Sequence, residues 1–207
     1  MEQKIEIINN WNLSKLILEL EKGNIKIPKF QRDYIWERTK VVKLLNSIYH
    51  QYPIGSFFFW IAPKEYRNFI RENKELGLED TDKSESVQFI LDGQQRMISL
   101  FVSLRGKIMN GVDYGTICFN PTRKEFIIPR SKNDKKNIPV WKLFNNSVYG
   151  EVYKDLISKS TTKNNVVAEN WRECHEIFTH YPISIVKTIN DDLEDVVEIF
   201  DRINQSG

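Results

Sequence analysis

The stretch Phe89-Ile90-Leu91-Asp92-Gly93-Gln94-Gln95-Arg96 changes character at Asp92. The apolar run Val87–Leu91 predicts a buried strand. The residues from Gln94 to Leu104 repeat apolar side chains every three or four positions and predict a helix. Gly93 lies between the two elements, and a glycine there permits a tight turn and the close approach of a ligand to the backbone. The stretch therefore predicts a strand, a turn and a helix in direct succession.

The first turn of that helix has the properties of an anion site. N–H groups at a helix start have no partner within the helix and favour negative charge. Arg96 adds a guanidinium that can hold a phosphate through two hydrogen bonds, while Gln94 and Gln95 offer neutral donors and acceptors. In the alternative interpretation, Asp92 only caps the helix and Arg96 is a surface charge, because Asp-Gly is a common turn. Local sequence alone supports both equally.

Two distant segments carry similar polar groups. The segment Pro28–Trp36 places Gln31 and Arg32 between aromatic residues. Taken alone, its aromatic residues favour a loop anchored on the core. Near the C-terminus, Arg202 and Asn204 point away from the apolar side of a predicted helix. Taken alone, this is a helix end with a cation near its C-terminus.

The rest of the chain mixes helical and strand patterns. Helices are predicted at 12–22, from 37 to about 52, at 64–76, 148–160 and 165–179, and after a possible cap at Asn190. Strands are predicted at 25–27, 55–61, 116–120, 125–128 and 183–187. Residues 77–86 are polar and predict a loop. This mixture predicts an α+β fold, with strand pairing left open.

The composition is that of an ordinary globular protein. The 207 residues are 41% hydrophobic and 28% charged, with a net charge of +2, so any nucleic-acid surface is expected to be a local patch. The two cysteines cannot form a disulfide framework, and no apolar run is long enough to cross a membrane. We expect a cytoplasmic protein without membrane contact. The ending at Gly207 suggests a fragment of a longer protein.

The three polar segments, taken in order, resemble those of a known family. The order Ile27-Pro28-x-Phe30-Gln31-Arg32-x-Tyr34-x-Trp36, then Leu91–Arg96, then Phe200-x-Arg202-Ile203-Asn204-x-x-Gly207 is similar to the GmrSD restriction endonuclease N-terminal domain family. The resemblance covers residues 12–207 as one domain. It implies a ParB/sulfiredoxin-like fold, with a small mixed sheet and surrounding helices. One departure is Met97-Ile98-Ser99, where many members have Leu-Thr.

The resemblance also implies a function and a set of residues. Members are prokaryotic, many act in defence against phage or modified DNA, and their N-terminal domain is thought to bind and hydrolyse nucleoside triphosphates. A nuclease region often follows the domain in full-length members, which makes it an expected partner. The nucleotide pocket would be lined by Gln31, Arg32, Tyr34, Trp36, Asp92, Gly93, Gln94, Gln95, Arg96, Arg202 and Asn204.

Within that pocket the expected chemistry is phosphoryl transfer to water. Arg32, Arg96 and Arg202 would neutralise phosphate charge. Asp92 would bind a magnesium ion, act as a base or cap the helix, and Gln94 or Gln95 would orient the attacking water. The chain has no Walker-type loop.

Other kinds of site receive little support. Cys174, His175 and His180 have poor spacing for a zinc site, so no protein-bound metal site is predicted. Cys118 lies in a predicted strand and is expected to be unreactive.

The stretch 123–136 is basic. It carries Arg123, Lys124, Arg130, Lys132, Lys135 and Lys136 against Glu125 and Asp134, a net of six minus two, or +4. The stretch could contact a DNA backbone without reading sequence, although a solvated loop is the better-supported interpretation.

Three hypotheses follow for the whole chain. The first is a domain that binds nucleoside triphosphates, either to hydrolyse them or to sense them, within a DNA-targeting defence protein. The second is a DNA-binding or nicking module, in which the same arginines hold a DNA phosphate. The third is a non-catalytic interaction domain. The oligomeric state is left open.

Overall fold

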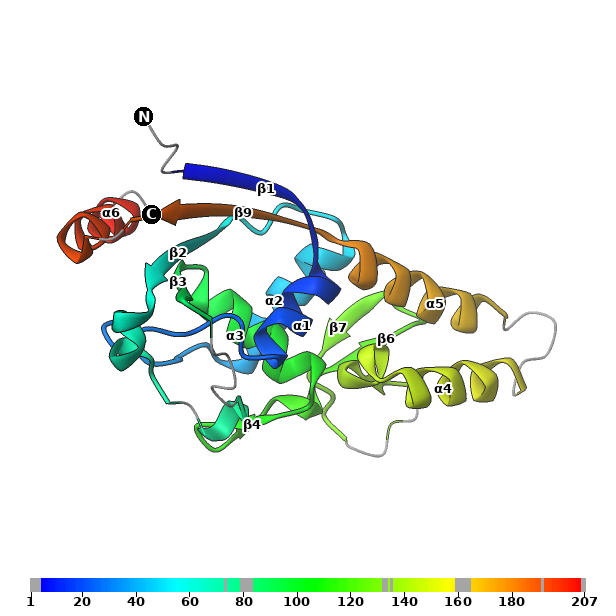
Figure 1. Cartoon of the computed structure of the whole chain (residues 1–207). Helices are drawn as coiled ribbons and strands as arrows, with labels where there is room; N and C mark the ends of the chain where they lie inside the picture. The colour runs from blue at the N-terminus through cyan, green and yellow to red at the C-terminus, as the bar shows by residue number, and fades with distance from the viewer. Residues whose placement is uncertain are drawn as a thin grey trace. The chain divides into compact units, whose positions relative to one another are not determined.

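The computed structural model describes residues 5–72, 74–78, 84–131, 134, 136–158, 165–190 and 192–205. Of these, residues 203–205 are described by their backbone alone. They divide into two compact units (Figure 1). Unit 1 combines Met1–Tyr34, Gly55–Met97 and Pro182–Gly207, and unit 2 combines Ile35–Ile54 and Ile98–Tyr181. No described helix is both long and apolar enough to cross a membrane.

Unit 1 is built on a four-stranded mixed sheet. Its strands are β1 (Ile5–Asn12), β9 (Pro182–Ile189), β2 (Phe57–Pro63) and β3 (Ser86–Asp92), in that order across the sheet. The β2–β9 pair is parallel and the other two pairs are antiparallel. The outer strands β1 and β3 therefore come from distant parts of the sequence.

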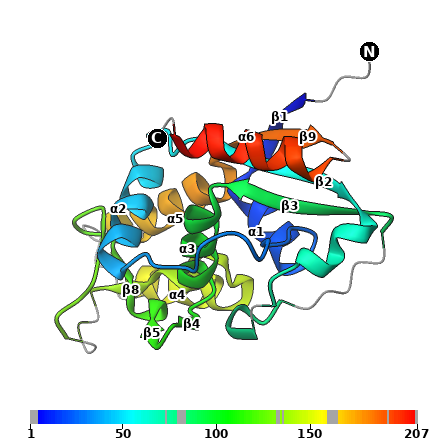
Figure 2. The same cartoon turned by 90° about the vertical axis from the view of Figure 1, so that its left-hand side faces the viewer.

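Helices cover this sheet on both sides. Helix α1 (Leu13–Glu21) begins at Asn12, whose side chain accepts a hydrogen bond from the Lys15 amide, and buries the apolar side that its spacing predicts. Helix α6 (Leu193–Gln205) lies along the other face and contacts β3 (Figure 2). Under α6, Val196 packs in an apolar cluster with Trp60 and Phe89.

The connection between β2 and β3 contains two short 3₁₀ helices, η1 (Lys64–Phe69) and η2 (Lys74–Leu76). The short helix predicted at 64–76 is therefore replaced by two separate 3₁₀ helices. Just after η1 the chain becomes extended, because Ile70 pairs with Pro28 in an isolated antiparallel bridge. Part of the loop predicted at 77–86 lies outside the described residues.

In its described residues, unit 2 combines three α-helices, most of a fourth and small sheets. Its elements are α2 (Arg38–Tyr49), the larger part of α3 (Gln94–Leu104), β4 (Ile108–Met109), β5 (Val112–Asp113), η3 (Tyr114–Thr116), β6 (Cys118–Asn120), β7 (Glu125–Ile127), β8 (Ile138–Pro139), η4 (Val140–Phe144), α4 (Asn146–Ser158) and α5 (Asn165–His180). Aromatic rings from three elements meet in its core, where Phe119 and Phe126 lie 5.0 Å apart and Phe126 and Phe178 lie 5.2 Å apart.

The fold class predicted from the sequence is confirmed. The chain is α+β, with a small mixed sheet and surrounding helices. The strand–turn–helix at Asp92 is present, and the helix has the predicted bounds Gln94–Leu104. The strand predicted at 25–27 is reduced to one parallel bridge between Lys26 and Phe89. Strand β1 was not predicted.

Candidate functional site

The turn between β3 and α3 requires a glycine. Gly93 has a φ of +90°, in the left-handed region that side chains avoid. A Cβ atom at this position would lie 2.6 Å from Cδ1 of Phe57. The turn is therefore closed by direct packing of the Gly93 backbone on an aromatic ring of the neighbouring strand.

Arg96 is fixed beside that turn. Its Nη2 donates to the backbone carbonyl of Ser56 at 2.9 Å and to Oδ2 of Asp92 at 3.0 Å. Its guanidinium carbon lies 5.0 Å from the centre of the Phe57 ring. A Cβ atom at Gly55, which has a φ of +83°, would lie 2.6 Å from Nη1. Two glycines and a phenylalanine thus surround the guanidinium group.

The environment of Arg96 is partly desolvated, with 17% of the side chain exposed. Burial lowers the pKa of Arg96, and the nearby Asp92 carboxylate opposes this shift. An arginine keeps its proton at neutral pH even so. The site therefore holds a positive charge in a fixed position at the start of a helix.

The first polar segment is held against β3. Gln31 is buried, and its Nε2 donates to the carbonyl oxygens of Ile90 at 3.0 Å and Leu91 at 2.6 Å. These carbonyl groups immediately precede Asp92. The Gln31 amide therefore joins the first polar segment to the last residues of the strand that leads into the turn.

The two glutamines of α3 bind the same segment from the other side. Gln94 Nε2 donates to the carbonyl of Arg32 at 3.2 Å, and Gln95 Nε2 donates to the carbonyl of Asp33 at 3.0 Å. Gln94 is 4% exposed, and its Oε1 has no hydrogen-bond partner among the described atoms. In this structure both glutamine side chains contact backbone, so they support the segment directly.

These contacts place the backbone of Arg32 beside the first turn of α3. The Arg32 side chain is exposed and has no hydrogen-bond or ion-pair partner within the described part of the chain. Arg32 and Arg96 therefore differ in kind: one is an exposed cation and the other is a half-buried, fixed one.

Two aromatic residues of the first segment, Tyr34 and Trp36, belong to different units. Tyr34 is buried in unit 1. Trp36 belongs to unit 2, where its carbonyl accepts a hydrogen bond from the Tyr114 hydroxyl at 2.6 Å and its ring lies 4.3 Å from Lys40 Nζ.

The third polar segment lies on α6. The Phe200 ring meets the Phe30 ring edge-on at 5.9 Å, which joins α6 to the first segment within unit 1. Arg202 donates to Glu198 on its own helix, and 76% of its side chain is exposed. Asn204 lies in α6, and its side chain is outside the described residues.

Sequence reasoning missed Arg71, which binds the first segment from outside the three motifs. Its side chain donates to carbonyl oxygens of Lys29 and Gln31 and to the carboxylate of Asp33. It also missed Ser56 as a partner of Arg96. Nothing in the local pattern around either residue marks it, because each contact joins positions about 40 apart in the chain.

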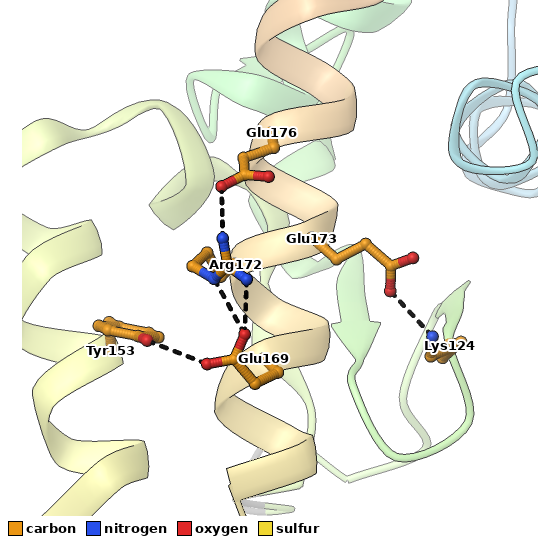
Figure 3. A network of polar contacts seen from close by, with 6 residues as sticks. All are labelled: Lys124, Tyr153, Glu169, Arg172, Glu173 and Glu176. Atoms are coloured by element: carbon orange, nitrogen blue, oxygen red, sulfur yellow. Dashed lines mark hydrogen bonds and ion pairs between the residues drawn. The ribbon is translucent and has the colours of Figure 1, made fainter.

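The basic stretch lies in unit 2, and part of its charge is neutralised. Arg123 pairs with Glu125 at 2.6 Å, and Lys124 pairs with Glu173 of α5 at 2.8 Å (Figure 3). Arg130 and Lys136 are exposed. Lys132 and Lys135 lie outside the described residues.

The two cysteines are buried free thiols. Burial raises the pKa of Cys118 to about 11 and raises the pKa of Cys174 well above its ordinary value. Among the described residues, no group of three or more histidine, cysteine or acidic side chains could hold a metal ion.

Comparison with known proteins identifies the family. Over 95% of its length the chain is similar to an uncharacterised protein of Methanocaldococcus jannaschii, MJ0686, at 23% identity. The aligned region spans 39% of that protein, so the chain covers well under half of the relative's length.

A second comparison covers nearly the whole chain. Residues 13–207 match the family described as the GmrSD restriction endonuclease, N-terminal domain. This span contains all three polar segments, including the Gly93 turn, Arg32 and Arg96. The chain therefore belongs to the GmrSD restriction endonuclease N-terminal domain family.

Proposed function

We propose that unit 1 binds a nucleoside triphosphate, with its phosphates at the start of α3, and that it hydrolyses the terminal phosphate. The observation that carries this proposal is the pairing of two unlike arginines at one helix start. Arg96 is fixed by Ser56 and Asp92, and the exposed Arg32 is held beside the same turn through Gln94.

This arrangement suits a polyphosphate ligand better than an anion that carries a single charge. A fixed cation and a helix N-terminus hold one phosphate without reorganisation. An exposed arginine on an adjacent backbone segment can then hold a second phosphate through its planar fork. The close packing of Phe57 and Arg96 on Gly93 requires a glycine at this position and fixes the turn beside the Arg96 guanidinium.

The proposed reaction is the attack of water on the terminal phosphorus. The bond to the bridging oxygen breaks, that oxygen keeps the electron pair, and the water releases a proton as the diphosphate and phosphate form. Arg32 and Arg96 stabilise the negative charge that spreads over the phosphate oxygens. Gln94 and Gln95 act by positioning the segment of Arg32, because their amide nitrogens are bound to its backbone.

Magnesium is the cofactor that this proposal implies, and the donor set at the turn fits a shared site. Asp92 is a carboxylate at the turn, with Oδ2 bound to Arg96. Mg²⁺ commonly binds one or two carboxylates together with substrate phosphates and keeps several waters. Asp92 would therefore hold an ion that arrives with the nucleotide, and that ion would neutralise phosphate charge.

The test compares two exposed arginines. We expect Arg32→Ala to weaken triphosphate binding by roughly 10- to 100-fold, the loss of one charge-assisted contact. Arg130→Ala, which removes an exposed arginine of unit 2, is the matched control and should bind as the wild type does. Titration calorimetry with ATP and GTP, with and without Mg²⁺, measures affinity, and a phosphate-release assay measures hydrolysis.

The outcomes distinguish the three hypotheses. Loss of binding in Arg32→Ala alone supports the nucleotide site. Binding without phosphate release indicates a nucleotide sensor. If Arg32→Ala and Arg130→Ala bind the triphosphate equally well, the proposed site is wrong. Cleavage of DNA by this chain without nucleotide supports a nicking module.

We infer further that the domain serves a longer DNA-targeting protein of the restriction type. The support is the family to which the chain belongs and the 39% of the relative's length that the alignment spans. In such a protein, nucleotide turnover here would control DNA cleavage by a region outside this chain. Arg130 and Lys136 remain candidates for contact with a DNA backbone. If they make this contact, DNA affinity should fall steeply as the salt concentration rises.

A further inference from the structure

The segment that carries Arg32 has no helix or strand of its own beyond a single bridge. Residues 29–36 lie outside every helix and strand, so their carbonyl groups need partners from elsewhere. Gln94 and Gln95 bind the carbonyl groups of Arg32 and Asp33. Side chains therefore determine where this segment lies.

Arg71 supplies the contacts on the N-terminal half of the segment. Its Nη2 donates to the carbonyl of Lys29 at 3.0 Å and to the carbonyl of Gln31, and its Nη1 donates to Oδ1 of Asp33 at 2.5 Å. One guanidinium thus reaches three residues on both sides of Arg32. About 20% of the Arg71 side chain is exposed, so the guanidinium is mostly covered, although the Asp33 side chain that it binds is 88% exposed.

The backbone of Arg71 is itself fixed to the same segment. Its N–H donates to the carbonyl of Ile27 at 2.8 Å, and the Lys29 N–H donates to the carbonyl of Phe69 at 2.8 Å. These bonds flank the bridge between Pro28 and Ile70. The side chain of Arg71 therefore extends from a fixed base, which limits the positions that its guanidinium can take.

We propose that Arg71 is a positioning residue for the nucleotide site: it holds residues 29–33 so that Arg32 meets the phosphates. This inference rests on the proposed function. Arg71 acts through Arg32 and does not touch the nucleotide. An arginine suits this role better than a lysine, because a planar group with five donors can serve three acceptors at once, whereas a lysine ammonium is a compact charge without that fork.

The first experiment tests the positioning without nucleotide. We expect Arg71→Met to speed amide hydrogen exchange across residues 29–33 and to open trypsin cleavage after Lys29 and Arg32, while exchange in α5 stays unchanged. Arg67→Met is the matched control. Arg67 precedes Arg71 by four residues and donates to the carbonyl of Ser84, outside the segment. Unchanged exchange in Arg71→Met would overturn the proposal.

The second experiment is a double-mutant cycle on triphosphate affinity, with Arg71→Met, Arg32→Ala and the double variant. We expect each single change to weaken binding by roughly 10- to 100-fold. The double variant should bind about as weakly as Arg32→Ala, because Arg71 acts through Arg32. Arg71→Lys should recover part of the affinity. Additive losses, or full affinity in Arg71→Met, would contradict the role of Arg71.

The two proposals fail in different ways. If the wild type binds nucleotide and Arg32→Ala weakens it while Arg71→Met does not, the nucleotide site stands and the Arg71 inference falls. If the wild type binds no nucleotide, both fall. Measurement well below each variant's Tm separates positioning from global unfolding, and Arg71→Lys provides a folded variant if Arg71→Met does not fold.

Discussion

Arg71 and Arg96 of unit 1 differ from Arg172 of unit 2 in the kind of contact that they make. In unit 1, Arg71 and Arg96 bind backbone carbonyl groups about 40 positions away in the chain and are mostly shielded from water. In unit 2, Arg172 binds Glu169 and Glu176 of its own helix, and 48% of its side chain is exposed (Figure 3). The contacts of Arg71 and Arg96 join separate parts of the chain, whereas those of Arg172 stay within one helix.

The difference shows which charged groups shape a site. A charged donor that binds the carbonyl group of a distant segment stabilises one backbone path, because its loss removes the contact that holds that segment in place. An exposed pair on one helix is screened by water and holds a turn that the helix already forms. The contacts of Arg172 therefore stay within α5, whereas the contacts of Arg71 and Arg96 hold the backbone around the candidate site in place.

The largest expected effect is that of Arg96→Ala. The change removes a half-buried cation and its hydrogen bonds to the Ser56 carbonyl and to Asp92. We expect a loss of about 3 kcal/mol in the free energy of unfolding, measured by urea titration, together with loss of triphosphate binding. If Arg96→Ala is as stable as the wild type and binds nucleotide equally well, Arg96 contributes no more than the exposed Arg172 does.

Gly93→Ala tests the same turn through its backbone. The positive φ and the 2.6 Å approach to Phe57 should cost about 2 kcal/mol of unfolding free energy. Gly150→Ala in α4 is the control, since a Cβ there meets nothing within 4 Å. That change should stabilise the protein by about 0.5–1 kcal/mol, because alanine favours helix. Equal effects at both positions would argue against a constrained turn.

His175 offers a smaller, pH-dependent effect on α5. Burial lowers the pKa of His175, while the Leu143 carbonyl at 2.8 Å partly opposes the shift. The unfolded chain then takes up the proton more readily. The stability linked to His175 is therefore complete above pH 6.5 and is lost as the pH falls below it toward the folded-state pKa. The ring is half-buried, so the loss should be small.

His175→Asn removes that titration while keeping a polar group near Leu143. Thermal unfolding of the variant should show a weaker loss of Tm between pH 7.5 and pH 5.5 than that of the wild type. If both proteins lose the same Tm, other groups account for the acid sensitivity of unit 2. A steeper loss in the variant would reverse the sign of the predicted effect.

The smallest expected effect is that of Arg172→Ala. Its hydrogen bonds to Glu169 lower the pKa of that exposed carboxyl, but water screens the pair. We expect a Tm close to that of the wild type at neutral pH and unchanged triphosphate affinity. A large drop in Tm would show that the exposed network of α5 stabilises unit 2 after all.

Much of the local structure could be predicted from the sequence. The spacing of apolar residues predicted α1, α2, α3 and the β6–β7 hairpin, because each depends on neighbours in the chain. The helix predicted at 64–76 is interrupted and 3₁₀ in type, because pairing of Ile70 with Pro28 extends the chain after η1. Strand β1 was missed, since most of its side chains are exposed and no buried pattern marks it.

The candidate site divides in the same way. The sequence by itself determined the strand, the Gly93 turn and the helix that carries Arg96, because these are local consequences of residue type. Only the tertiary structure decided that Gln94 and Gln95 bind the backbone of Arg32 and Asp33. A glutamine side chain reaches solvent or a carbonyl group equally well, so its partner depends on a chain segment about 60 residues away.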